Sequence, residues 1–226
     1  MRFLRQTDYS KQIREKNLLD IISNEEFNRI ESENLAIREM QNYLSCKYDV
    51  EKIFAPLFTF DIAQSYTEGQ RINYTEEDYD NLVSYVVGDR VSYQDKIYNC
   101  IADSTGNLPT DTNFWEYITA DNSIYVAAQD TAGNYPEDAT YWTFGDDRDP
   151  LILTYCIDIT LYHVHSRINP RNIPQLRIDR YDMAMMWLKG IKTGESPVYN
   201  LPELDLEDNE GRFIRIGSNN PRPQYY

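Results

Sequence analysis

The sequence predicts an α+β protein, a bundle of about four helices that carries an inserted small antiparallel β module and ends in an extended C-terminal arm. Three observations lead to this prediction. Helical hydrophobic periodicity is concentrated in residues 1–50 and 149–195, near the two ends of the chain. Residues 85–148 are rich in aromatic residues, Gly, Asp and Thr, and they alternate with a period of two. Residues 196–226 contain four prolines and show no helical period.

The N-terminal part, residues 1–84, is expected to supply one half of the bundle and a connecting arm. Ser23 and Glu26 have the spacing of a capping box, in which Glu26 reaches back toward Ser23. The helix that follows has a core-facing stripe of Phe27, Ile30, Ile37 and Leu44, which Ala36, Met40 and Tyr43 widen. Its solvated face carries Glu31, Glu33, Arg38 and Gln41. After residue 49 the pattern fails, so residues 49–84 are interpreted as an arm with partial structure.

The C-terminal half of the bundle, residues 149–195, is predicted to be a helical hairpin. Residues 151–165 are apolar on almost every side, so this helix must be buried. Asp149 can cap it, with Pro150 at the first helical position, where no N–H is required. The second helix is expected to begin near residues 172–174 and to stop at Gly194, in the C′ position that favours glycine.

The central segment, residues 85–148, contains an internal repeat with an offset of 27 positions. Tyr98 matches Tyr125 and Trp115 matches Trp142, and an Asp, a Gly-Asn pair, a Pro and a second Asp match between them without gaps. The first copy is preceded by a Gly-Asp-x-Val entry at residues 88–91, and the second copy lacks one. The second copy is therefore expected to be a truncated unit that leans on the first.

This first copy resembles the small chitin-binding-type carbohydrate modules attached to chitinases. The resemblance rests on the Gly-Asp-x-Val entry followed by Tyr, Gly-x-x-Pro and Trp. It implies that an exposed aromatic ring could stack on a sugar, and the candidates are Tyr93, Trp115 and Trp142. The module could equally be a spacer, or it could contact another protein through these residues. The competing interpretation is that these rings form the core of a small β unit, and we favour it for one of the two tryptophans.

A second resemblance covers the helical segments. Tyr43, Leu44, Lys47 and Tyr48 end the N-terminal helix, and the C-terminal half contains Asp158, Ile159, Tyr162, Arg180, Tyr181, Ala184, Trp187, Leu188 and Gly194. This order is similar to that of the head-to-tail adaptor proteins of tailed bacteriophages, also called connector or head-completion proteins. The family implies a structural virion protein at the head-tail junction, made and assembled in the host cytoplasm. It also implies a ring of about twelve copies that joins the portal to a neighbouring tail or connector protein and surrounds a DNA channel.

The C-terminal arm, residues 196–226, is expected to order on a partner by strand addition. Terminal arms of the adaptor family contact the portal. The resemblance therefore assigns the portal or tail interface to the centre of this arm, at Arg212, Phe213, Ile214 and Arg215. A terminus without a partner is the alternative interpretation.

The composition excludes several functional classes. A net charge of −15 argues against a protein that grips nucleic acid, so DNA is expected to pass through the ring without specific binding. The three cysteines are far apart and read as reduced thiols, and neither a signal peptide nor a transmembrane segment is expected.

Chemistry-bearing motifs are missing from the sequence, and we predict no enzyme activity, no cofactor and no metal. His163 and His165 are two positions apart and would point to different faces of a helix. The acidic turn at residues 145–149 could hold an ion, although a helix cap explains it as well. The functional alternative to an adaptor is a carbohydrate-binding accessory protein that binds a glycan through the inserted module.

Overall fold

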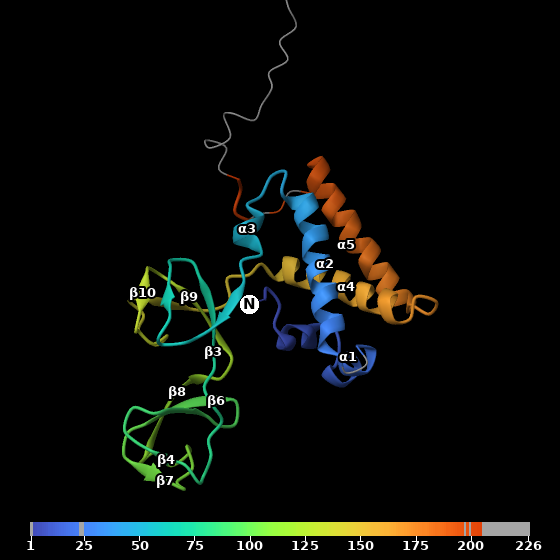
Figure 1. Cartoon of the computed structure of the whole chain (residues 1–226). Coiled ribbons are helices and arrows are strands. Elements are labelled where there is room, and N and C mark those ends of the chain that lie inside the picture. The colour runs from blue at the N-terminus through green and yellow to red at the C-terminus, as the bar shows by residue number, and fades with distance from the viewer. Residues whose placement is uncertain (1, 23–24, 197, 199, 205–226) are drawn as a thin grey trace, which may run out of the picture.

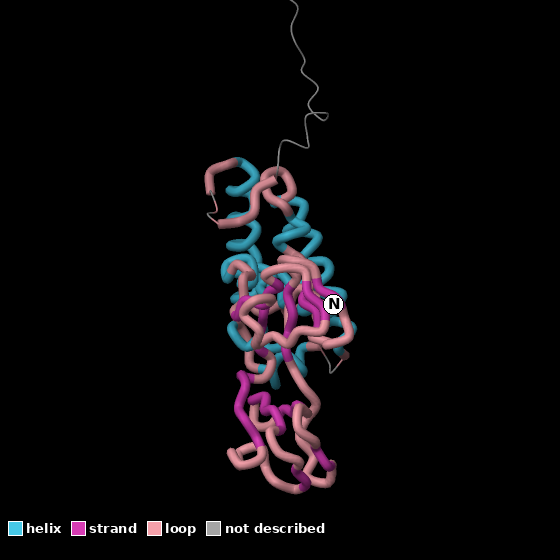
Figure 2. The backbone as a smooth tube through the Cα atoms, turned by 90° about the vertical axis from the view of Figure 1, so that its left-hand side faces the viewer, coloured by secondary structure: helices cyan, strands magenta, loops and turns pink. Residues whose placement is uncertain are grey.

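The computed structural model describes residues 2–22, 25–196, 198 and 200–204. The molecule is elongated, with a helical part at one end and two small β units that follow one another away from it (Figures 1 and 2). The unit beside the helices, here called the proximal unit, is built from residues 57–74 and 123–144. The unit at the far end, the distal unit, is built from residues 76–120.

The helical part closes the two ends of the chain into one hydrophobic core. Its buried residues come from positions 3–54 and 152–201, and the closest packing joins α2, α4 and α5. The elements are the 3-10 helix η1 (Gln6–Lys11), α1 (Glu15–Ile21), α2 (Glu26–Leu44), α3 (Val50–Ile53), α4 (Pro150–Ile168) and α5 (Gln175–Thr193).

The C-terminal hairpin begins and ends where the sequence predicts. The Asp149 carboxylate accepts hydrogen bonds from the backbone N–H groups of Leu151 and Ile152 at 2.8 and 2.9 Å, and Pro150 occupies the first position of α4. Gly194 ends α5 with a φ of +81°, a left-handed conformation that costs glycine little. The predicted cap of α2 at Ser23 lies outside the described residues.

The buried face of α2 includes Ala36, Met40 and Leu44, as predicted, but its N-terminal half differs from the prediction. Phe27 is 59% exposed, whereas Glu33, expected in solvent, is buried. The Glu33 carboxylate accepts hydrogen bonds from Arg29 Nη1 at 2.5 Å and from Tyr9 Oη at 2.8 Å. This pairing makes the buried charge tolerable, although burial still raises the pKa of Glu33. The true buried face is Arg29, Ser32, Glu33, Ala36, Met40 and Leu44.

The predicted fold class, a bundle of about four helices with one small antiparallel insert, is wrong. The described residues form a mixed α and β structure in which eleven strands make four sheets, and β1 pairs with β3 in parallel. The strands are β1 (Leu57–Thr59), β2 (Ser65–Tyr66), β3 (Arg71–Tyr74), β4 (Ser84–Tyr85), β5 (Arg90–Ser92), β6 (Lys96–Cys100), β7 (Ser104–Thr105), β8 (Trp115–Ala120), β9 (Ser123–Ala127), β10 (Thr131–Ala132) and β11 (Trp142–Phe144).

The error arises in residues 57–74, which we expected to be part of a connecting arm. These residues form β1, β2 and β3, and their partner strands β9 and β10 lie about fifty residues or more further along the chain. Strands of two to four residues are too short to show a clear alternation of polar and apolar positions. Their pairing is therefore visible only in the tertiary structure.

A buried arginine fastens the N-terminal segment to the start of α4. The Arg148 side chain is fully buried, and its Nη1 donates to the Phe3 backbone oxygen at 2.5 Å and to Asp8 Oδ2 at 2.9 Å. The second nitrogen, Nη2, donates to Asp146 Oδ2 at 2.8 Å. Both carboxylates compensate the buried charge, so the same contacts stabilise the closure of the two chain ends.

Arg148→Ala is expected to lower the free energy of unfolding by about 3–5 kcal/mol, because it removes the fully buried ion-pair partner of Asp8 and leaves this buried carboxylate with the longer contact to Arg5, at 3.4 Å. Urea denaturation followed by circular dichroism measures this loss. Arg171→Ala removes an exposed arginine from the loop between α4 and α5 and serves as the control, with an expected change within about 0.5 kcal/mol. A loss below about 1 kcal/mol for Arg148→Ala would contradict the role given to this contact.

Candidate functional site

The structure separates the residues that the sequence nominated for binding. Arg212, Phe213, Ile214 and Arg215 lie outside the described residues. Trp115 and Trp142 are 1% and 2% exposed, and Tyr93 is half-buried. Both tryptophans are therefore core residues, and the core interpretation, which we favoured for one of them, holds for both.

The two tryptophans occupy equivalent places in the two β units. Trp115 Nε1 donates to the Asn107 backbone oxygen at 3.0 Å, and Trp142 Nε1 donates to the Asn134 backbone oxygen at 3.1 Å. The acceptors, like the donors, are 27 positions apart. Each indole packs against two aromatic rings, and a third ring packs against the first of these two. The rings are Phe60, Tyr66 and Tyr74 around Trp142, and Tyr79, Tyr85 and Tyr93 around Trp115.

These three rings in each unit reveal a second offset, of 19 positions, that the sequence analysis missed. Tyr85 stacks on Tyr79 and its hydroxyl accepts from the Asp80 N–H at 2.9 Å. In the proximal unit, Tyr66 stacks on Phe60 and accepts from the Asp61 N–H at 2.7 Å. Residues 60–74 are thus the counterpart of residues 79–93.

The second copy of the repeat is therefore complete, and the expectation of a truncated unit is wrong. Its entry half, residues 60–74, precedes the first copy, and the whole distal unit is inserted between the two halves of the proximal unit. The sheet β3-β9-β11 corresponds to β5-β6-β8, and the pair β2-β10 corresponds to β4-β7. A Gly followed by x-Arg and then Ile or Val, at Gly69 and Gly88, was the signal that could have revealed this.

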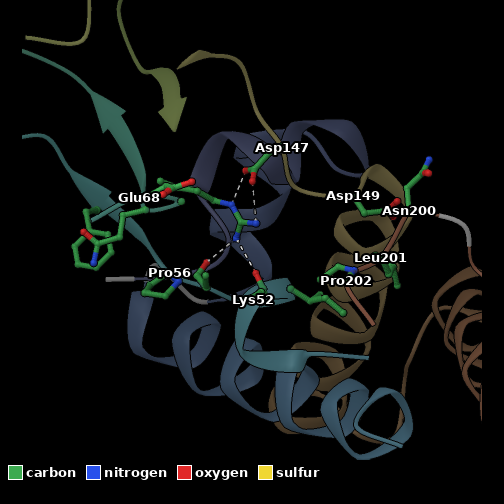
Figure 3. Close-up of a pocket in the computed structure, with 14 residues that line it drawn as sticks. Lys52, Pro56, Glu68, Asp147, Asp149, Asn200, Leu201 and Pro202 are labelled. Atoms are coloured by element: carbon green, nitrogen blue, oxygen red, sulfur yellow. Dashed lines mark hydrogen bonds and ion pairs between the residues drawn. The ribbon is translucent and has the colours of Figure 1, made fainter. Parts of the chain in front are cut away.

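A corresponding arginine holds each unit to the part of the molecule before it. In the proximal unit this residue is Arg71, which contacts the helical part. Its Nε lies 2.5 Å from Asp147 Oδ1, and its Nη2 lies 3.2 Å from Oδ2 of the same residue. Its Nη1 donates to the backbone oxygens of Lys52 and Ala55 at 3.3 Å. Figure 3 shows these bonds converging between Asp147 and Lys52.

The same joint borders a cavity of about 550 Å³ between the proximal unit and the helical part. Its wall is mixed in chemistry, with Phe58 and Pro56 on one side and Glu68 and Asp147 among the polar groups. The only arginine among its lining residues already has its hydrogen bonds satisfied by protein groups. The cavity is a packing gap at a joint, without a convergent set of free polar groups that would hold a ligand.

Arg90, the counterpart of Arg71, holds the distal unit to the proximal one. Its Nη1 donates to Tyr74 Oη at 2.6 Å and pairs with Glu137, and its guanidinium lies 3.4 Å from the centre of the Tyr135 ring. Burial raises the pKa of Tyr74, so its hydroxyl stays protonated beside the arginine. The distal unit is thus fixed relative to the helices through two successive arginine joints.

The outward face of α5 is the main exposed apolar surface of the helical part. Leu176, Met183 and Met186 are 56%, 57% and 70% exposed and lie at spacings of seven and three residues. Such spacing places the three side chains along one stripe of the helix. Apolar side chains in a line on a helix are typical of a surface that another chain covers.

The described part of the chain shows no arrangement of side chains suited to a metal ion. None of its groups of His, Cys, Asp and Glu could hold a metal ion. His163 Nε2 lies 2.9 Å from Glu39 Oε2, and the hydrogen bond lowers the pKa of this carboxyl; burial lowers the pKa of His165, which points elsewhere. The acids of residues 145–149 pair with Arg71 and Arg148 or cap α4. Within the described residues no helix is long and apolar enough to cross a membrane.

Comparison with protein-family models, curated proteins and solved structures gave no match.

Trp115→Ala and Trp142→Ala are each expected to cost about 3–5 kcal/mol of stability, because they empty the centre of a small aromatic core. Thermal and urea unfolding measure this loss. Phe144→Ala is the matched control, since this ring is 68% exposed and its removal should change stability by less than about 1 kcal/mol. A folded, undestabilised Trp142→Ala protein that had lost affinity for a glycan would instead support a sugar platform.

The Arg71 joint is tested by a double-mutant cycle with Asp147. Arg71 is nearly buried while Asp147 is 45% exposed, so we expect a coupling free energy of about 1–2 kcal/mol in unfolding experiments. The pair Lys52 and Asp49, in which the lysine is 75% exposed, is the control and should couple by less than about 0.5 kcal/mol. Equal coupling in the two cycles would show that Arg71 does not fasten the joint.

Proposed function

We propose that this protein is a head-to-tail adaptor of a tailed bacteriophage, a structural virion protein that forms a ring between the portal and the next tail component. The observation that carries the proposal is that the residues responsible for the family resemblance contact one another in the helical core. Arg180 Nη1 lies 3.2 Å from Asp158 Oδ1, and the rings of Tyr162 and Tyr181 stack at 4.0 Å with an interplanar angle of 18°.

The same network reaches α2 and so links the two halves of the resemblance. Tyr181 Oη donates to Glu39 Oε1 at 2.8 Å, and the other oxygen of Glu39 contacts His163. Hydrogen bonding and the negative charge of Glu39 add to burial in raising the pKa of Tyr181. The hairpin α4-α5 and the helix α2 therefore act as one unit, as a ring subunit requires.

The start of the C-terminal arm is anchored where the family places the end of its first long helix. Tyr48 is fully buried, its hydroxyl donates to the Val198 backbone oxygen at 3.2 Å, and its backbone bridges Glu203. The Asp49 N–H donates to the Pro202 oxygen at 2.9 Å. The arm thus leaves the helical part from a fixed point, which supports a role in docking to a partner.

Ring assembly would use the apolar stripe of α5, here meaning Leu176, Met183 and Met186. A closed ring repeats one interface many times, so a contact that is weak between two copies becomes stable in the assembly. The acidic character of the chain suits a channel through which DNA passes without being gripped. The two β units then project from the ring subunit as a lateral arm (Figure 1).

The proposal is tested by mixing the purified protein with the portal protein of the same phage and imaging the product by negative-stain electron microscopy. A ring seated on the portal vertex is the expected result. A protein that remains a single subunit of 26.7 kDa in the presence of the portal would overturn the assignment.

The double variant Met183→Glu with Met186→Glu is expected to abolish ring formation without unfolding the subunit, because both side chains are exposed and two carboxylates cannot be buried in an apolar contact. Mass photometry should then report the 26.7 kDa subunit where the unchanged protein gives rings. Thr112→Glu, at an exposed site of the distal unit, adds a charge away from α5 and should leave assembly intact. Rings that persist in the double variant would exclude this stripe as the interface.

A further inference from the structure

The distal unit exposes aliphatic side chains at positions where the proximal unit, which is its duplicate, carries other residues. Six aliphatic residues with exposed fractions from 42% to 84% flank the β4-β7 ladder: Leu82, Val83, Val86, Val87, Ile101 and Leu108. This set is here called the distal tip. The ladder lies at the end of the molecule farthest from the helical part (Figure 1).

Backbone contacts draw the distal tip together. The Val87 N–H donates to Asp103 Oδ1 at 3.2 Å and the Gly88 N–H to the Cys100 oxygen at 2.8 Å, which brings residues 86–88 beside residues 100–103. On the other side, a Cβ added to Gly106 would lie 3.7 Å from the Asn81 oxygen, so residues 106–108 adjoin residues 81–83. The ladder itself pairs Ser84 with Thr105.

The proximal unit shows that the module folds without these side chains. At the six corresponding positions it carries Ala63, Gln64, Thr67, Glu68, Ala128 and Tyr135. Because the hydrogen bonds and aromatic core of the two units correspond, the aliphatic set is not required by the fold. An exposed apolar set that the fold does not need is typical of a binding surface.

One of these positions is already covered by a neighbour in the proximal unit. Tyr135, the counterpart of Leu108, lies beneath the guanidinium of Arg90 from the distal unit, 3.4 Å from ring centre to cation. Leu108 is 47% exposed. The distal unit is the last in the series. It therefore leaves Leu108 open at the position where the proximal unit has Tyr135 covered by Arg90.

The charge around the distal tip selects the kind of partner. Residues 76–120 contain nine acidic residues against two basic ones, and Asp80 and Asp103 are exposed next to the aliphatic set. Two copies of this acidic tip would repel each other, and so would an anionic membrane surface. We propose that the distal tip binds another protein through an apolar surface bordered by lysine and arginine side chains.

The test exchanges the six tip residues for their proximal counterparts in the full-length chain: Leu82→Ala, Val83→Gln, Val86→Thr, Val87→Glu, Ile101→Ala and Leu108→Tyr. The probe is a labelled amphipathic helical peptide of leucine and lysine, followed by fluorescence anisotropy at physiological salt. We expect the exchange to weaken binding by about tenfold or more, because burial of the aliphatic side chains is lost. The exchange adds one negative charge, so purely electrostatic binding would instead become stronger.

Two controls make the result specific to the distal tip. Phe144→Ser removes an exposed ring outside the tip and should leave affinity for the peptide unchanged. A leucine-glutamate peptide of the same pattern should not bind. Equal affinity of the exchanged and unchanged proteins for the leucine-lysine peptide, or equal binding of both peptides, would overturn the proposal.

Two other kinds of partner, a second copy of this chain and a lipid surface, are tested by separate measurements on the same two proteins. Self-association in sedimentation velocity that the exchange abolishes would assign the surface to a second copy of this chain and overturn the proposal. Binding to phosphatidylcholine vesicles that the exchange abolishes would assign it to a lipid surface, with the same consequence. The exchanged protein should still form rings with the portal, so the outcome is independent of the proposed adaptor role.

Discussion

The rest of the structure depends on the closure of the two ends of the chain into one helical core. Residues 3–54 and 152–201 share a single set of buried side chains, and Arg148 bonds the first segment to the beginning of α4. A buried guanidinium is costly without partners, so its bonds to Asp8 and Asp146 also make the closure specific. Everything between residues 57 and 144 then leaves and re-enters the core at nearby points, which is the condition under which an insertion is tolerated.

The insertion is itself a nested pair. One β unit is interrupted between β3 and β9 by a second unit with the same hydrogen bonds, the same buried tryptophan and the same surrounding rings. In each unit an arginine lies two positions after a glycine. Arg71 joins the proximal unit to the helical part, and Arg90 joins the distal unit to the proximal one. A repeated joint lets the chain extend outward from the helices by a fixed step, and the last unit in the series is the one with an uncovered aliphatic tip.

The burial of both tryptophans weakens the carbohydrate-binding hypothesis relative to the adaptor hypothesis. In the chitin-binding-type interpretation one ring should face solvent, but both indoles are enclosed and donate to backbone oxygens. The two apolar surfaces that gather several exposed side chains, the stripe on α5 and the distal tip, consist of aliphatic and methionine side chains. Aliphatic surfaces favour protein partners over sugars, since sugar recognition relies on flat aromatic faces with wet polar edges. This chemistry is consistent with a protein whose work is assembly.

The sequence by itself determined the helical hairpin, its Asp149 cap and Gly194 stop, and the 27-position repeat, because these depend on contacts between residues close together in the chain. Only the tertiary structure decided that Glu33 lies on the buried face of α2, because its carboxylate is paired there with Arg29 and Tyr9. It also decided that residues 60–74 belong to the second copy. Short strands have too little pattern of their own, and their partners lie far along the chain, so their pairing energy is absent from any local stretch of sequence.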